Sequence, residues 1–205
     1  MKFVALLFAV VAVEAAMPSP SRAADPRYPD WPCVQPKVPE LSSASMWNGP
    51  AIDSVGDSWQ DDPKTRELVA KLAARRTPLE EAKKDIAEFM TGDAAAKQDK
   101  AKKLFAGVFA TLSQERSQVL DGIERAERNE RDLADKIKTD VAALHDLEDK
   151  PQQDQTDVTK LADQVQWSTT IFDDRRKTIR YVCDVPNTIE QRLFAIARAI
   201  QQYLD

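Results

Sequence analysis

Cys33 and Cys183 are the only cysteines, and their chemistry is the easiest to assign from the sequence. In an oxidising compartment an even pair of cysteines most simply forms a disulfide, and a bridge that closes so long a loop strongly constrains the unfolded chain. A redox pair or a soft metal site is the alternative, but neither a Cys-x-x-Cys spacing nor a neighbouring histidine supports it. We therefore predict a structural disulfide between Cys33 and Cys183.

Few other residues are spaced for catalysis or for metal binding. His145 is the only histidine, and the sequence pairs it with no serine or cysteine nucleophile. Asp57, Asp61 and Asp62 form a small acidic group, which helix capping explains more simply than a calcium site. Zinc, haem, EF-hand and phosphate-loop motifs do not occur in the sequence. We therefore predict no catalytic residue, no metal site and no cofactor, and a protein that is not an enzyme.

The charge balance bears on the partners that the chain could bind. The sequence has 29 Lys and Arg against 34 Asp and Glu, a formal net charge of −5. Nucleic-acid-binding domains carry a basic footprint, so no nucleic-acid partner is expected. One basic cluster stands out: Arg175, Arg176, Lys177 and Arg180. We expect it to pair with acidic residues of an opposing helix, with an anionic lipid or an acidic partner as the alternative.

Residues 1–23 have the features of a secretory signal peptide. Lys2 supplies a positive start, residues 3–13 form an apolar run, and the segment Ser21-Arg22-Ala23 offers small residues for cleavage. We expect cleavage near Ala23 and a mature protein that is periplasmic or secreted. No later stretch of the sequence is apolar enough to cross a bilayer, so membrane insertion is not expected.

Residues 24–62 are predicted to form an extended arm. Six prolines disfavour helix in this stretch, and it contains three of the four tryptophans, Trp31, Trp47 and Trp59. Disordered linkers usually contain few aromatic residues. The favoured interpretation is a strap that presses its apolar side chains onto the helices, namely Trp31, Val34, Val38, Leu41, Met46 and Trp47. The alternative is a partner-binding surface formed by Trp31, Trp47 and Trp59.

The remaining residues, 63–205, are predicted to form a helical domain that begins with short helices at 63–76 and 78–91. Asp61 or Asp62 is placed to cap the first helix, and Thr77-Pro78-Leu79-Glu80 has the pattern of a capping box for the second. Gly92 is suited to ending the second helix, and Asp93 to capping the next one. Together the two short helices predict a compact head.

Residues 93–150 contain no proline and form the longest predicted helix, roughly 85 Å at ~1.5 Å per residue. Up to Leu112 its apolar face is broad, as in a globular bundle. From Val119 the face narrows to a stripe of apolar residues three and four apart, the pattern of a coiled coil, in which Glu130 fills one inward position. Gly107 marks either a close approach by a tryptophan or another helix, or a merely tolerated glycine.

A return helix is predicted at 153–183, with apolar residues at the complementary spacing: Val158, Leu161, Val165, Ser168, Phe172, Ile179 and Val182. The segment from Trp167 to Phe172 is expected to lie in the core. Pro186 is expected to break the chain, and Asn187 with Glu190 to cap a last helix at 188–204. The predicted fold is therefore all-α: a long antiparallel coiled-coil helical hairpin projects from a small helical head, and the disulfide straps the irregular Pro/Trp-rich arm onto it.

The predicted shaft and the lack of catalytic residues favour one function. We expect an exported, non-catalytic helical interaction protein of the bacterial periplasm: an adaptor, chaperone or accessory subunit for another envelope protein. One alternative is a small-ligand or metal carrier with a pocket between the Trp-rich arm and the head. The other is a self-assembling structural coiled-coil protein, a homo-oligomer formed through the hairpin.

Overall fold

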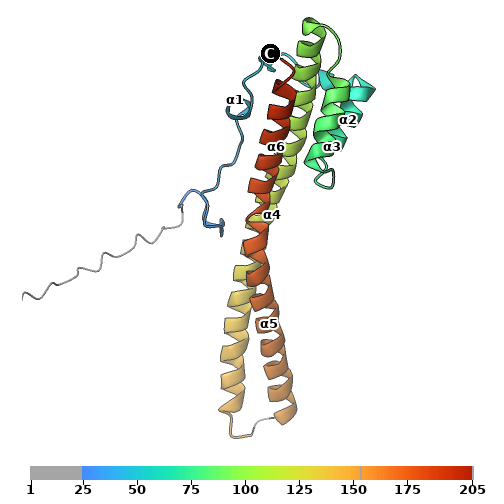
Figure 1. Cartoon of the computed structure of the whole chain (residues 1–205). Helices are drawn as coiled ribbons and strands as arrows, with labels where there is room; N and C mark the ends of the chain where they lie inside the picture. Colours follow the sequence, from blue (N-terminus) through green and yellow to red (C-terminus); the bar gives the residue numbers. More distant parts are fainter. Residues whose placement is uncertain (1–24, 153, 205) are drawn as a thin grey trace, which may run out of the picture.

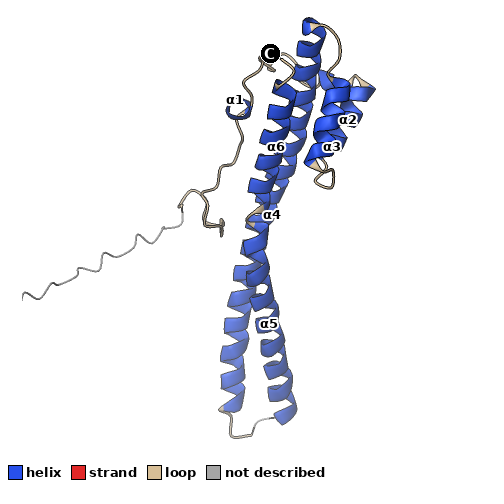
Figure 2. Ribbon diagram, viewed as in Figure 1, coloured by secondary structure: helices blue, strands red, loops and turns tan. Residues whose placement is uncertain are grey.

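The computed structural model describes residues 25–152 and 154–204, and the chain is all-α over these residues. Figure 2 shows helices joined by turns and loops, without a strand in the described part of the chain. The predicted signal peptide and its cleavage site near Ala23 lie outside the described residues. Among the residues described, no helix is both long enough and apolar enough to cross a bilayer.

Two short helices, α2 (Pro63–Ala73) and α3 (Leu79–Phe89), begin the head. The Asp62 carboxylate accepts hydrogen bonds from two backbone N–H groups of the first turn of α2, so the predicted cap is confirmed. The predicted capping box of α3 is wrong, because Pro78 rather than Thr77 stands at the N-cap position and no side chain caps this helix. Both helices also end two or three residues earlier than predicted.

Helix α4 (Ala94–Glu148) contains 55 residues and forms the axis of the molecule (Figure 1). The Asp93 carboxylate caps its first turn, as predicted. All of the buried residues of α4 lie between Ala101 and Ile123. Over this first half α4 therefore forms the floor of the head, and beyond Ile123 its apolar side chains are only partly covered.

Helix α5 (Gln155–Val182) returns alongside the second half of α4, and α6 (Val185–Gln201) continues along the first half (Figure 1). The predicted break around Pro186, with Asn187 as a cap, is wrong. The residues between the helices, Cys183 and Asp184, keep helical backbone angles, and Pro186 falls in the first turn of α6. Proline is tolerated there because the first turn of a helix does not use its backbone N–H groups.

The core of the head forms where α2, α3 and α6 pack on α4. Its largest fully buried side chains include Leu72, Ile86, Leu104, Phe105, Leu112, Ile189, Leu193, Ile196 and Ile200. At Gly107 both α2 and the arm approach α4 closely, because an added Cβ would lie 2.6 Å from Val69 and 2.8 Å from Trp59. This confirms that Gly107 makes room both for a tryptophan and for a neighbouring helix.

The arm contains two short helical turns, α1 (Ser43–Met46) and the 3-10 turn η1 (Ser58–Gln60). Trp47 is buried and stacks on Phe105 of α4, with ring centroids 4.4 Å apart and an interplanar angle of 7°. Trp59 packs against Gly107 on the same helix. These two tryptophans therefore complete the core of the head.

Candidate functional site at the neck

The N-terminal part of the arm crosses the two long helices where α5 meets α6. We call this region the neck; it comprises residues 30–39 of the arm, 116–134 of α4 and 171–183 of α5. Cys33 and Cys183 form the predicted disulfide here, with Cα atoms 5.6 Å apart. The bridge joins residues 150 positions apart in the sequence, so it fixes the arm covalently to the end of α5.

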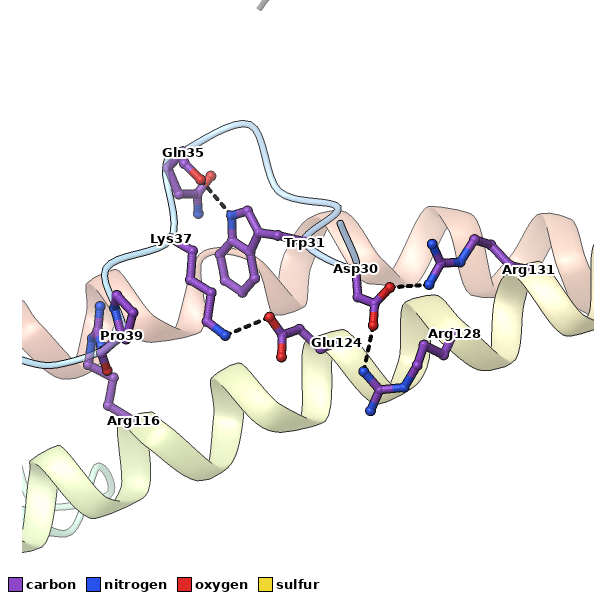
Figure 3. A network of polar contacts seen from close by, with 9 residues as sticks. All are labelled: Asp30, Trp31, Gln35, Lys37, Pro39, Arg116, Glu124, Arg128 and Arg131. Atoms are coloured by element: carbon purple, nitrogen blue, oxygen red, sulfur yellow. Dashed lines mark hydrogen bonds and ion pairs between the residues drawn. The ribbon is translucent and has the colours of Figure 1, made fainter. Parts of the chain in front are cut away.

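Charged side chains fix the same part of the arm to α4 (Figure 3). The Asp30 carboxylate forms ion pairs with Arg128, at 2.8 Å, and with Arg131. These two hydrogen-bonded guanidinium groups, that of Arg128 first, hold the pKa of Asp30 below its ordinary value. Lys37 forms a second ion pair, 2.5 Å from Glu124, and its ammonium group is largely buried.

Neutral and carbonyl contacts complete the attachment. The Trp31 indole N–H donates to the backbone carbonyl of Gln35 at 2.7 Å, and its ring lies beneath the loop of the arm (Figure 3). The side-chain amide of Gln35 donates to the carbonyl of Cys183 at the bend between α5 and α6. One disulfide, two sets of ion pairs and these hydrogen bonds therefore hold about ten residues of irregular chain in a single position.

Arg116 of α4 connects the Pro39 end of this segment with α6. Its side chain is buried, and Nε donates to Glu190 of α6 at 2.6 Å. Its Nη1 donates to the carbonyl of Pro39 in the arm at 3.3 Å. A charged side chain is almost never buried unless it is paired, so Arg116 is a structural link between α4, α6 and the arm.

The attached arm leaves its own apolar side chains in water. Val34 is 81% exposed and Val38 is 51% exposed, so the prediction that both anchor the strap is wrong. The disulfide and the ion pairs fix the backbone instead, and both valine side chains remain largely in water. A signal for this outcome exists in the sequence, because Pro32 and Pro36 flank the Cys33–Gln35 segment and favour extended backbone, in which alternate side chains point to opposite sides.

A groove of about 1060 Å³ lies between α4 and α5 at the neck. Its lining is largely apolar, with Ile123, Ala126, Ala134, Ile171, Phe172, Ile179 and Val182 from the helices and Pro32 and Val34 from the arm. Arg175, Arg176 and Arg180 also line it, and none of the three forms an ion pair within the described part of the chain. The predicted pairing of this basic cluster with an opposing helix is therefore wrong.

Glu130 lies between the groove walls on the inward stripe of α4 and is half-buried. Its Oε1 atom is enclosed and has no hydrogen-bond partner among the described residues. Loss of water around the carboxyl group raises its pKa, and Glu127 adds to this rise, whereas the positive charges of Arg175 and Arg176 oppose it. The groove therefore contains a carboxylate and several guanidinium groups that lie near one another without forming a direct pair.

The three tryptophans predicted to form a partner-binding surface lie in different surroundings. Trp31 is half-buried at the neck, whereas Trp47 and Trp59 pack on the head core. Trp167 was expected in the core of the helix pair, but it is 68% exposed, so this prediction is wrong. His145 is exposed near the tip, 3.5 Å from Glu148, and no cluster of potential metal ligands is present among the described residues.

Comparison of the chain with protein-family models, with curated proteins and with solved structures gave no match.

Proposed function

We propose that this chain is an exported, non-catalytic helical interaction protein of the bacterial periplasm: an adaptor, chaperone or accessory subunit for another envelope protein. The observation that carries the proposal is the attached arm. Residues 30–39 are fixed by a disulfide to the residue that follows α5 and by ion pairs with α4, yet they hold Val34 and Val38 in water. A strap that served only to complete the core would bury such side chains.

A fixed loop with exposed apolar side chains suits protein recognition for an energetic reason. Ordering a flexible segment upon binding costs roughly 0.5–1.5 kcal/mol for each immobilised side chain, and a loop that is already ordered avoids most of the backbone part of this cost. Surface apolar residues held in one place commonly mark interaction sites. We therefore assign Val34 and Val38 to the centre of the partner surface.

The charges beside the arm indicate the chemistry of the partner. Arg176 and Arg180 line the groove together with Val34, and both lack an ionic partner among the described residues. Guanidinium groups form strong bidentate bonds with carboxylates. The proposed partner therefore presents acidic residues around an apolar contact.

We further propose that α4 and α5 beyond Ile123 act as an antiparallel coiled-coil hairpin that projects from the head. The support is the stripe of apolar residues on α4 (Leu133, Ile137, Val141, Leu144 and Leu147), all half-buried along the side of α5. The hydrogen bond of 2.8 Å from Gln164 to Asp140 connects the two helices midway along this length.

Site-specific photocrosslinking in the native envelope tests the partner surface. A photoreactive amino acid is placed at position 34 or 38, and at Lys84 on the exposed side of α3 as the matched control. We expect positions 34 and 38 to capture the same envelope protein and position 84 not to capture it. The proposal is contradicted if the arm positions give no specific adduct, or if position 84 gives the same one.

A small-ligand carrier is the second candidate, and the size of the groove favours it. Ligand pockets commonly have volumes of about 300–1,000 Å³, and the neck groove, at about 1060 Å³, is slightly larger than this range. Titration with the apolar anion 1-anilinonaphthalene-8-sulfonate tests this candidate. Saturable binding of one probe molecule that Ala126→Phe abolishes supports a carrier, whereas the absence of saturable binding removes it.

A further inference from the structure

The groove at the neck lies beside apolar side chains that the two long helices cover only in part. Beyond Ile123, α4 has no buried residue, and the whole of α5 has only Val158 and Ser168. The lining extends from Gly122 to Ala134 on α4 and from Ile171 to Val182 on α5. At ~1.5 Å per residue, each helical wall of the groove is about 17–18 Å long. A helix that filled the groove would therefore contribute about 12 residues.

The exposed charges of the groove have one sign when the ion pairs are set aside. Arg131 is paired with Asp30, and Asp174 is paired with Lys177. The remaining exposed charged side chains of the lining are Arg175, Arg176 and Arg180. None of these arginines has an ionic partner within residues 25–152 and 154–204. A segment that enters the groove therefore meets unpaired positive charge.

Two carboxylates also line the groove, but they are less accessible than the arginines. Glu127 and Glu130 are both half-buried. Glu130 lies on the inward stripe of α4, and its Oε1 atom is enclosed. An incoming charged group therefore reaches the guanidinium groups before it reaches either carboxylate.

Arg176 and Arg180 are unpaired although acidic residues lie at suitable positions nearby in the sequence. Asp173 lies three residues before Arg176, and Asp184 lies four residues after Arg180, which are spacings at which ion pairs commonly form. Neither of these pairs forms in the described part of the chain. The guanidinium group of Arg176 lies instead over the ring of Phe172, a residue of the groove lining, 5.6 Å from its centroid. Both arginines are therefore available to an acidic partner.

The two arginines lie on the side of α5 to which the arm is attached. Arg176, Arg180 and Cys183 share one face, because they follow one another at intervals of four and three residues. Cys183 is bonded to Cys33, which directly precedes the exposed Val34. A partner that contacts Val34 can therefore continue along the groove and meet both arginines, which are about 6 Å apart along the helix axis.

The chemistry of the groove walls favours a helix over an extended peptide. Both long walls are helices, whose own backbone groups are bonded internally and are not available to another chain. An extended peptide on this largely apolar lining would lose water from its backbone N–H and C=O groups without gaining partners from the two helices. A helix bonds its own backbone groups and presents apolar side chains three and four residues apart to such a groove.

We propose that the neck groove binds an acidic amphipathic helix of the partner, which packs on α4 and α5 as a third helix. The apolar stripe of this helix covers Ile123, Phe172 and Ile179. Its carboxylates, one turn apart, pair with Arg176 and Arg180. This inference rests on the proposed function, because it identifies which segment of the same partner is bound.

Photocrosslinking in the native envelope tests where the partner binds. A photoreactive phenylalanine derivative replaces Phe172 in the groove or, as the matched control, Tyr181, an aromatic residue that is 77% exposed and outside the lining. Nine residues separate these positions, so they lie about 180° apart around α5. We expect position 172 to capture the protein that position 34 captures, and position 181 not to capture it. Mass spectrometry of the adduct should locate a segment with apolar residues three and four apart and acidic residues one turn apart.

The outcomes separate this inference from the proposed function. Capture at position 34 without capture at position 172 overturns the inference and leaves the proposed function standing. The same conclusion follows if position 181 gives the adduct of position 172, or if the captured segment lacks acidic residues or the helical pattern. An absence of adducts at both arm positions contradicts the proposed function and this inference together.

The affinity of the captured segment tests the proposed contacts. The segment is synthesised, and its Kd for the whole mature protein is measured by fluorescence anisotropy. We expect Arg176→Glu/Arg180→Glu to raise the Kd at least about 10-fold, because like charges then face each other. The control Lys160→Glu/Lys177→Glu makes the same change in net charge outside the groove lining and should alter the Kd by less than about 3-fold. Equal effects of the two double variants, or a peptide whose circular dichroism shows no gain of helix on binding, overturn the inference.

Discussion

Glu130 connects the stability of the neck with pH. Loss of water raises the pKa of its carboxyl group. The folded chain then binds more protons than the unfolded chain, so the free energy of unfolding falls as the pH rises from about 4.5, the ordinary value, through the raised value. We expect Glu130→Gln to raise the free energy of unfolding by up to about 1 kcal/mol at neutral pH, with no gain below about pH 4.

Denaturant unfolding at two pH values measures this effect. Asp140→Asn is the control of opposite sign, because hydrogen bonds from Lys136 and Gln164 lower the pKa of Asp140. The stabilisation from that carboxylate is present above its ordinary pKa of 3.8 and is lost as the pH falls through the lowered value. A loss of stability in Glu130→Gln at neutral pH would mean that attraction to Arg175 outweighs the loss of water.

The two glycines of α4 should respond oppositely to alanine. At Gly107 a new methyl group would collide with Val69 and Trp59, so we expect Gly107→Ala to lower the free energy of unfolding by about 1–3 kcal/mol. At Gly122 the methyl group meets open space. We expect Gly122→Ala to raise the free energy of unfolding by about 0.5–1 kcal/mol, because alanine favours helix more than glycine does. Thermal unfolding of both variants compares them directly. Equal changes in the free energy of unfolding would contradict the inference that Gly107 is closely packed and Gly122 is not.

Single residues were the hardest feature to predict from the sequence. The inward stripe of α5 was predicted with Ser168 in it, and Ser168 is buried. The neighbouring Trp167 must then point about 100° away, yet its aromatic character suggested a core position. The prediction that Val34 is buried failed for a similar reason. The hydrophobicity of a side chain indicates that it prefers burial, but the disulfide and the ion pairs on either side of Val34 fix the backbone and leave this side chain exposed.

Whole helices were easier to predict, because their ends depend on local chemistry. Asp62 and Asp93 cap α2 and α4 as the sequence indicated, and these caps require only neighbouring backbone N–H groups. The start of α6 could not be predicted in this way. A proline that breaks a helix and a proline in the first turn of a new helix have the same sequence signature, and packing of α6 on α4 decides between them.

The contact between α4 and α6 near the neck depends on the ion pair between buried Arg116 and half-buried Glu190, 2.6 Å apart. Removal of Glu190 leaves the buried guanidinium group without its carboxylate, so we expect Glu190→Met to lower the free energy of unfolding by about 3 kcal/mol. Replacement of both residues by methionine should recover most of this loss. Denaturant unfolding of the two single variants and the double variant forms a double-mutant cycle. If the losses in the free energy of unfolding were additive, the two residues would not be coupled.

The attachment of the arm should depend on the disulfide more than the head does. We expect Cys33→Ser/Cys183→Ser to lower the free energy of unfolding by about 2–5 kcal/mol. Hydrogen exchange should accelerate over residues 25–41, where the arm loses its covalent bond, and should change little over α2 and α3, whose contacts do not involve Cys33. An increase of the same size in both regions would show that the arm is integral to the head.

The molecule as a whole divides its stability unevenly between the head and the shaft, which is the part of α4 and α5 beyond Ile123. Fully buried apolar side chains of α2, α3, α4 and α6 concentrate in the head, whereas the shaft has a half-covered seam. Local unfolding free energies generally follow such differences in burial. The half-covered shaft is suited to separating its two ends and to binding further helices along its side. It contributes little to the free energy of unfolding of the head.

A matched deletion tests this division. Residues 134–140 and 163–169 lie level in the register set by Asp140 and Gln164, and removing seven residues from each helix preserves both apolar stripes. We expect the shortened protein to form the Cys33–Cys183 disulfide and to unfold within about 4 °C of the midpoint of the full-length protein.

A five-residue deletion from each helix, residues 134–138 and 165–169, is the control. It turns the stripe beyond the deletion by about 140° on each helix, so that apolar side chains that face the other helix in the intact protein become exposed. This control should therefore unfold at a clearly lower temperature than the seven-residue deletion. The proposed division would be contradicted if both deletions lowered the unfolding midpoint equally. The head would then depend on the full length of the shaft, even when the apolar stripes are preserved.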